Sequence, residues 1–252
     1  LEIPHYTSGP YGEIRAWLQE EIERTRIKRQ IKAADFFAVK KEGQFQVGFL
    51  GQPSTGKSSI IKALSHAQIK VAAYAFTTLK PQPAIIPING IDFQLLDLPG
   101  LIENASQGKG LGKRILSVVH NVDGIVFVMD ITKPFEELNQ IIHELTQTGI
   151  IPLKNKPAII AVNKIDLLEN PRNIEEVKKE FNEYKIIPIS ATQSKNLSQL
   201  KDAIWEMSGF IRIYSKGDMK KPIALWKGAP VKDFASKIHK EFVEKFKEAK
   251  IT

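Results

Sequence analysis

The sequence predicts an α/β protein built on a mainly parallel six-stranded sheet, with one antiparallel edge pair and helices on both faces. Three observations support this fold class. Short apolar runs alternate with helical patterns between residues 44 and 209. Asn89-Gly90 joins two of these runs and is a strong signal for a two-residue hairpin. A helical pattern precedes the alternating region, and a small α+β segment follows it.

Six apolar runs predict the strands of the sheet. In the first run, Phe45, Val47 and Phe49 alternate with other residues, as expected for a strand. The other runs lie at 83–88, 91–97, 124–129, 158–162 and 186–189. Helical patterns lie near 57–65, 112–120, 134–148, 173–184 and 197–207. Because strands and helices alternate, most connections should cross a face of the sheet, which makes the joined strands parallel.

The two ends of the chain follow other patterns. Residues 11–34 predict a helix, since apolar residues recur at helical spacing. Residues 210–214 and 222–226 predict two strands, and residues 231–248 predict a helix with phenylalanines on one face. The expected divisions are an N-terminal helical segment (1–43), a central domain (44–209) and a C-terminal segment (210–252).

The composition excludes several classes of protein. Of 252 residues, 42% are hydrophobic and 25% are charged, as in folded soluble domains. The chain has no cysteine, which excludes disulfides, thiolate catalysis and cysteine-based zinc sites. No apolar run reaches 18 residues, and the N-terminus lacks the layout of a signal peptide. We therefore expect a cytoplasmic protein without a membrane partner.

The positive charge is concentrated in the last sixth of the chain. The formal charge is +8, and residues 211–252 alone contribute +6, with 11 basic and 5 acidic groups. Such a surplus suggests an anionic partner such as RNA or the ribosome, although it could serve solubility alone. The expected phosphate-backbone contacts are Lys216, Lys220, Lys221, Lys227, Lys232, Lys237, Lys240, Lys245 and Lys247.

Residues 51–58 fit the phosphate-binding pattern G-x-x-x-x-G-K-[ST]. They follow a predicted strand and open a predicted helix, where backbone N–H groups and the helix dipole favour an anion. Lys57 can neutralise the β- and γ-phosphates, and the Ser58 hydroxyl can bind Mg²⁺. The expected nucleotide contacts of this loop are Gly51, Gln52, Pro53, Ser54, Thr55, Gly56, Lys57, Ser58 and Ser59.

The segment 163–166, Asn-Lys-Ile-Asp (the N-K-x-D motif), follows an apolar strand and is expected to select the base of the bound nucleotide. The Asp166 carboxylate can accept hydrogen bonds from guanine N1 and the exocyclic amine, whereas adenine has no such pair of donors. Asn163 can hold the base and the phosphate loop, and the Lys164 stem can cover the ring. Ser190, Ala191 and Thr192 follow the last strand, where the Ala191 N–H could reach guanine O6.

A third motif, Asp-Leu-Pro-Gly at 97–100, ends the predicted strand 91–97. A carboxylate at this place can hold Mg²⁺ through water, so Asp97 joins Ser58 as a metal-binding candidate. The Gly100 N–H can contact the γ-phosphate. Alone, this pattern would indicate a turn. Its place between the other two motifs indicates instead that it binds the metal ion and the γ-phosphate.

Together these motifs resemble those of the translation-factor-class GTPases. Residues 74–81 (Tyr-Ala-Phe-Thr-Thr-Leu-Lys-Pro) resemble switch I of the Obg family, and residues 97–103 with 108–112 resemble its switch II. The tail resembles the branch of developmentally regulated GTP-binding proteins, in which a G domain precedes a small β-grasp TGS domain. The matching tail segments are 211–214, 228–233 and 238–240.

The resemblance implies a P-loop NTPase G domain that hydrolyses GTP to GDP and phosphate as a conformational switch. It implies that Thr78, with Thr77 as the close alternative, binds Mg²⁺ and the γ-phosphate, so that Lys57, Thr78 and Gly100 form the catalytic set. Many GTPases have a glutamine after the D-x-x-G motif, whereas this chain has Leu101. We therefore expect slow intrinsic hydrolysis unless another group, a regulatory protein or a potassium ion positions the water.

The chain also departs from its relatives. It lacks the Gly-rich N-terminal domain of bacterial Obg, and only 27 residues separate strand 124–130 from strand 158–162, which leaves no room for the insertion of the developmentally regulated branch. The TGS-like segment ends after its helix and is expected to be incomplete. An alternative function stays open: an RNA-binding adaptor whose guanine nucleotide is structural and turns over negligibly.

Overall fold

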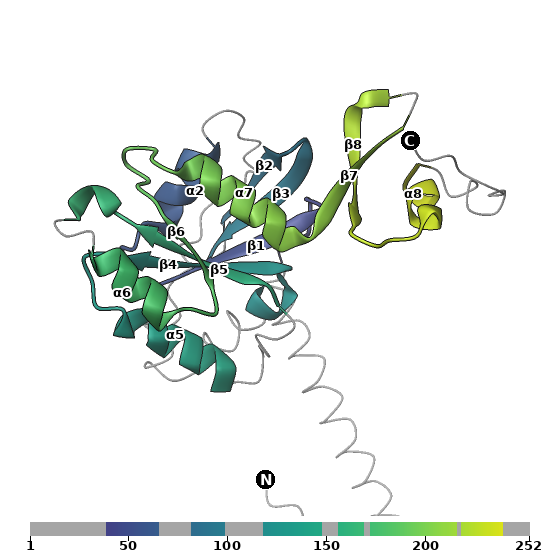
Figure 1. Ribbon diagram of the computed structural model, residues 1–252. Coiled ribbons are helices and arrows are strands. Elements are labelled where there is room, and N and C mark those ends of the chain that lie inside the picture. Colours follow the sequence, from purple (N-terminus) through teal and green to yellow (C-terminus); the bar gives the residue numbers. More distant parts are fainter. Residues whose placement is uncertain are drawn as a thin grey trace, which may run out of the picture. The chain divides into compact units, whose positions relative to one another are not determined.

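The computed structural model describes residues 39–65, 82–98, 118–147, 156–168, 172–215 and 218–238, all within the compact unit Val39–Thr252. Figure 1 shows a central sheet with helices on both of its sides. The predicted helix over 11–34 lies outside the described residues, as does most of the predicted helix 112–120. The strands are β1 (Phe45–Leu50), β2 (Gln82–Ile88), β3 (Ile91–Asp97), β4 (Gly124–Asp130), β5 (Ala158–Asn163), β6 (Lys185–Pro188), β7 (Phe210–Ser215) and β8 (Asp218–Trp226).

The main sheet has six strands in the order β2-β3-β1-β4-β5-β6. Only β2 and β3 pair in antiparallel fashion, and the other neighbours are parallel. The turn between β2 and β3 has positive φ at Asn89 (53°) and Gly90 (80°), as a two-residue hairpin turn requires. The predicted α/β class, with its single antiparallel edge pair, is therefore confirmed.

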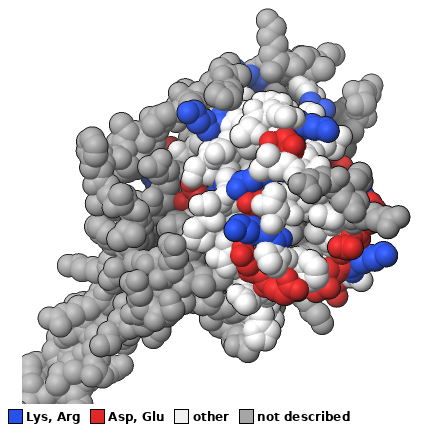
Figure 2. Space-filling view, turned by 90° about the vertical axis from the view of Figure 1, so that its left-hand side faces the viewer, with Lys and Arg blue, Asp and Glu red and all other residues white. Residues whose placement is uncertain are grey.

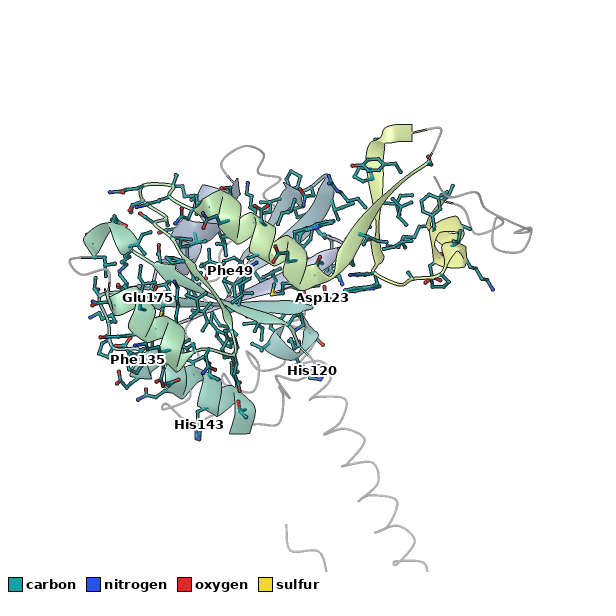
Figure 3. The ribbon with its side chains drawn as sticks, in the orientation of Figure 1. Phe49, His120, Asp123, Phe135, His143 and Glu175 are labelled. Carbon is teal, nitrogen blue, oxygen red and sulfur yellow. The ribbon has the colours of Figure 1, made fainter. Side chains whose placement is uncertain are left out.

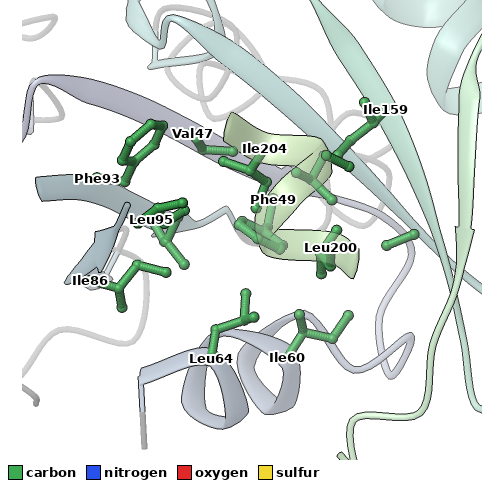
Figure 4. Close-up of a cluster of buried hydrophobic side chains, with 14 of the residues drawn as sticks. Val47, Phe49, Ile60, Leu64, Ile86, Phe93, Leu95, Ile159, Leu200 and Ile204 are labelled. Atoms are coloured by element: carbon green, nitrogen blue, oxygen red, sulfur yellow. The ribbon is translucent and has the colours of Figure 1, made fainter. Parts of the chain in front are cut away.

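Helices cover the sheet from both sides, with α2 and α7 on one side and α5 and α6 on the other (Figure 1). The side under α2 and α7 is packed with aromatic and branched side chains, including Val47, Phe49, Ile60 and Leu200 (Figure 4). Alternate residues of β1 point to this side, as the sequence pattern predicted. The helices are α2 (Lys57–Ser65), α5 (Glu136–Gln147), the 3₁₀ turn η2 (Ile165–Leu167), α6 (Arg172–Glu180), α7 (Leu197–Ser208) and α8 (Val231–Ile238).

A two-stranded sheet, β7 with β8, follows α7 and is joined to the main sheet by an aromatic cluster. The ring of Phe210 lies 5.7 Å from Phe45, 6.2 Å from Phe93 and 6.4 Å from Trp205 between centroids. Phe210 is thereby buried at the edge of the main sheet where β1 and β3 begin. The two strands predicted for the C-terminal segment are present, and their base is held by this cluster.

The described part of α8 is tied to both sheets. Lys237 Nζ donates hydrogen bonds to the Ala224 carbonyl (2.9 Å) on β8 and to Gln44 Oε1 (3.3 Å) just before β1. The sequence grouped Lys237 with the lysines expected to contact a phosphate backbone. In the structure its ammonium group already binds protein oxygens, so it stabilises the position of α8.

Candidate functional site

The phosphate-binding loop connects the end of β1 to the start of α2. Two of its positions admit only glycine, because a Cβ at Gly51 would lie 2.2 Å from the Val128 carbonyl oxygen, and a Cβ at Gly56 would lie 2.3 Å from Asn163 Nδ2. Gly56 also has a φ of +93°. The loop therefore packs directly against β4 and against Asn163, which fixes its shape before any nucleotide binds.

Lys57 and Ser58 occupy the first turn of α2. Lys57 Nζ donates to the carbonyls of Gly51 and Gln52, both at 2.9 Å, so the side chain folds back over the loop. The Ser58 hydroxyl donates to the Asp97 carboxylate at the end of β3. β1 and β3 are parallel, and Asp97 lies opposite Phe49, which brings the two motifs together. A hydroxyl and a carboxylate side by side are oxygen ligands of the type that Mg²⁺ prefers.

Asn163, at the end of β5, joins three segments of the site. Its Nδ2 donates to the Thr55 carbonyl (2.9 Å), and its Oδ1 accepts the Ala191 N–H (3.1 Å). Only 2% of its surface is exposed. The predicted link between Asn163 and the phosphate loop is thus observed. The Ala191 N–H already has Asn163 as its partner, so a contact with guanine O6 would have to share or replace this bond.

Asp166 is the middle residue of η2, which begins directly after Lys164, and the φ of 65° at Lys164 turns the chain at the end of β5. Hydroxyl groups of Ser190 and then Thr192 (Oγ1 to Asp166 Oδ2, 3.2 Å) stabilise the carboxylate and hold the pKa of Asp166 below its ordinary value. Its other oxygen, Oδ1, is buried and accepts no hydrogen bond from the residues that the structure describes. A buried, unsatisfied carboxylate oxygen indicates a missing donor.

Lys164 forms an ion pair that sequence reasoning missed. Its Nζ lies 2.6 Å from Asp130 Oδ2, and Thr132 donates to Asp130 Oδ1 from its N–H (3.0 Å) and its hydroxyl (2.7 Å). Burial alone would raise the pKa of Asp130, but the hydrogen bonds from Lys164 and Thr132 outweigh it and lower the pKa. The only signal in the sequence was an acid at the end of an apolar strand, and its place opposite Asn163 is decided by the pairing of β4 with β5.

These side chains border a hollow of about 530 Å³. Apart from Leu167, all of the residues that line it were predicted from the sequence; the lining consists of Ser54, Gly56, Lys57, Ser58, Ser59, Asn163, Lys164, Asp166, Leu167, Ala191 and Thr192. Leu167 was missed, although it directly follows the N-K-x-D motif, and 58% of its surface is exposed. Thr77, Thr78, Gly100 and Leu101 lie outside the described residues.

No cluster of charged side chains competes with this hollow as a metal site. Among the described residues, no group of three or more His, Asp or Glu side chains could hold a metal ion. His120 and His143 are exposed and lie on separate helical segments (Figure 3). The face in Figure 2 shows basic and acidic side chains next to each other rather than a field of one sign.

The ion pair between Lys164 and Asp130 makes stability depend on pH. Because the folded-state pKa of Asp130 is lowered, its contribution is complete above about pH 4 and is lost as the pH falls through the folded-state value. Asp130→Asn should therefore reduce the loss of unfolding free energy on acidification, measured by urea unfolding at a series of pH values. The matched control is Asp92→Asn, at an exposed position of β3. Equal pH dependence in the Asp130 variant and the wild type would contradict this prediction.

The sequence matches the family described as 50S ribosome-binding GTPase over residues 46–164. An uncharacterized GTP-binding protein of Methanocaldococcus jannaschii, MJ1326, is 30% identical, with 97% of this chain and 81% of the relative covered. Developmentally-regulated GTP-binding protein 1 of Xenopus laevis is 30% identical, and Ribosome-interacting GTPase 1 of Saccharomyces cerevisiae is 29% identical; each comparison covers 84% of this chain and 76% of the relative.

The alignment with the Methanocaldococcus protein runs over 317 positions, more than the 252 residues of this chain. That relative therefore has internal residues without a counterpart here.

Among solved structures, Era in complex with MgGDPNP and nucleotides 1506–1542 of 16S ribosomal RNA is similar, with a TM-score of 0.53 and 26% identity. The match covers 77% of this chain and 64% of the Era chain. None of the described helices has the length and apolar character needed to cross a membrane.

Proposed function

This chain belongs to the family of developmentally regulated GTP-binding proteins, and on that basis we propose that it is a GTP-hydrolysing switch that acts on the ribosome or on RNA. Its GTPase activity follows from the family. The target is supported by two relatives, one named for its interaction with ribosomes and one solved with ribosomal RNA. Such a role belongs in the cytoplasm.

The unsatisfied Oδ1 of Asp166 is the observation that carries the assignment to guanine. Guanine offers two donors on one edge, N1–H and the exocyclic amine, and a carboxylate can accept both. Lys164 lines the hollow, and its ammonium group is held by Asp130, so its aliphatic stem can cover the base. Leu167, which also lines the hollow, can add apolar contact. Against adenine, the buried Oδ1 of Asp166 would gain no donor from the base, which penalises ATP.

The other end of the hollow holds the phosphates. On binding, Lys57 Nζ exchanges its two carbonyl partners for phosphate oxygens, which bear full negative charge and make stronger hydrogen bonds. The residues that hold Mg²⁺ are Ser58, Asp97 and, by family resemblance, Thr78. The ion, when bound, neutralises charge on the phosphate oxygens. Thr78 and Gly100 respond to the γ-phosphate, so that hydrolysis releases both switch segments.

The hydrogen bond from Ser58 to Asp97 supports the proposed metal site, because it brings a hydroxyl oxygen and a carboxylate oxygen together. Leu101 leaves the attacking water without the amide group that many GTPases supply at that position. We therefore propose a slow intrinsic rate that a ribosome, a regulatory protein or a potassium ion raises.

Single-turnover hydrolysis tests this function against the alternative of an adaptor with a structural nucleotide. The rate of GTP cleavage should rise at least about tenfold when ribosomes are added, since positioning the water removes part of the barrier. The measurement is phosphate release with and without ribosomes, in potassium and in sodium. Lys57→Ala should remain inactive in every condition. A wild-type rate that no condition stimulates would favour the adaptor.

A further inference from the structure

We propose that the exposed indole of Trp226 is a stacking platform for a base of single-stranded RNA, with Arg212 and Lys227 on the neighbouring phosphates. The proposal rests on the action on ribosome or RNA proposed above. It deepens that function by naming a surface and the form of RNA that the surface would bind. This surface belongs to the β7–β8 sheet, separate from the nucleotide hollow.

Trp226 is the last residue of β8 and is supported from one side. Its ring lies 4.5 Å from Phe210 and 6.3 Å from Phe45, measured between centroids. These two neighbours fix the orientation of the indole, yet 55% of the residue surface is exposed. A large aromatic ring that is held firmly and left open loses little conformational entropy when a flat partner stacks on it.

Arg212 projects from the same face of the two-stranded sheet. It pairs with Ala224, whereas Trp226 pairs with Phe210, so Arg212 and Trp226 occupy diagonal positions of one face. Side chains at such positions are separated by about 7–8 Å, within reach of one extended ligand. Arg212 is exposed, and no described acidic side chain forms an ion pair with it. The guanidinium group is therefore available to a phosphate.

Lys227, the residue after Trp226, adds a second exposed cation. Its backbone N–H donates to the Gly209 carbonyl (3.0 Å), which fixes the chain immediately after Trp226 while the side chain stays exposed. Residues 210–238 contain seven basic and two acidic residues. This excess favours a polyanion over an apolar peptide. A single strand is required, because a base within a duplex is already stacked and cannot reach an aromatic side chain.

The test is a titration of the full chain with a labelled, unstructured oligouridylate, followed by fluorescence anisotropy at several salt concentrations. Trp226→Ala should weaken binding about tenfold without changing the salt dependence, whereas Trp226→Phe should retain most of the affinity. Arg212→Gln and Lys227→Gln should each reduce the slope of log affinity against log salt by about 0.7. Trp205→Phe, in the same aromatic cluster, is the matched control and should bind like the wild type.

Three results would overturn the platform: wild-type affinity in Trp226→Ala, an equal loss in Trp205→Phe, or equal affinity for duplex RNA. A chain that sediments with ribosomes but does not bind the oligonucleotide would also overturn it. That outcome leaves the proposed function intact. Conversely, oligonucleotide binding that depends on Trp226, without any effect of ribosomes on hydrolysis, supports the platform and contradicts the switch.

Discussion

Replacing Asp166 with Asn should reverse the nucleotide preference from GTP to xanthosine triphosphate. Among the described residues, one buried oxygen of this carboxylate has no hydrogen-bond partner, and under the proposed assignment guanine would supply donors to it. An asparagine amide presents an N–H group instead, which opposes the guanine amine but matches the carbonyl of xanthine. Loss of two charge-assisted hydrogen bonds should weaken GTP binding by about 100-fold, as measured by displacement of a fluorescent nucleotide.

Two controls make this result specific. Asp202→Asn, on an exposed position of α7, should leave both affinities unchanged. Tight binding of xanthosine triphosphate to Asp166→Asn would show that the fold and the phosphate loop are intact, so that lost GTP affinity reflects the base alone. A variant that still prefers GTP as strongly as the wild type would refute the assignment of Asp166 to the base.

Asn163→Ala should both destabilise the protein and weaken nucleotide binding. The substitution removes the donor to the Thr55 carbonyl and the acceptor of the Ala191 N–H, and leaves those buried groups unpaired. We expect a loss of about 3 kcal/mol in the free energy of unfolding and a fall in Tm of about 10 °C. GTP affinity should fall at least about tenfold, because the phosphate loop and the segment after β6 lose their common support.

The matched control is Asn139→Ala, which removes an amide that donates to Glu180 on the exposed surface of α5 and α6. Its unfolding free energy should stay within about 0.5 kcal/mol of the wild type. Differential scanning calorimetry and nucleotide titration check both variants. Equal effects of the two substitutions would contradict the central structural role of Asn163.

The phosphate-binding loop and the base motif were predictable because each is a short run of residues whose spacing carries the chemistry. A glycine, a lysine and a serine at fixed intervals after a strand fold locally into an anion site. The hairpin at Asn89-Gly90 was predictable for the same reason, because its turn depends on two adjacent residues that both tolerate positive φ. The alternation of strands and helices then placed both motifs at the same edge of a parallel sheet.

Residues that act only through distant partners were not predictable. Asp130 lies 34 positions before Lys164, and no spacing rule connects an acid at the end of β4 with a lysine after β5. The Ala191 N–H was expected to be open to the base, but Asn163 Oδ1 binds it across 28 positions. Lys237, counted among the free lysines, bonds to Gln44 at the other end of the described chain.

The sequence by itself determined the fold class and the place of the 51–58 loop and of Asp166 at the ends of strands, because strand periodicity and motif spacing act over a few residues. Only the tertiary structure decided which polar groups have hydrogen-bond partners within the protein and which do not. Burial and hydrogen bonding depend on neighbours that the chain brings together from far apart. Only folding could therefore show that Asp166 Oδ1 has no partner in the described part of the chain, and that Trp226 is supported yet exposed.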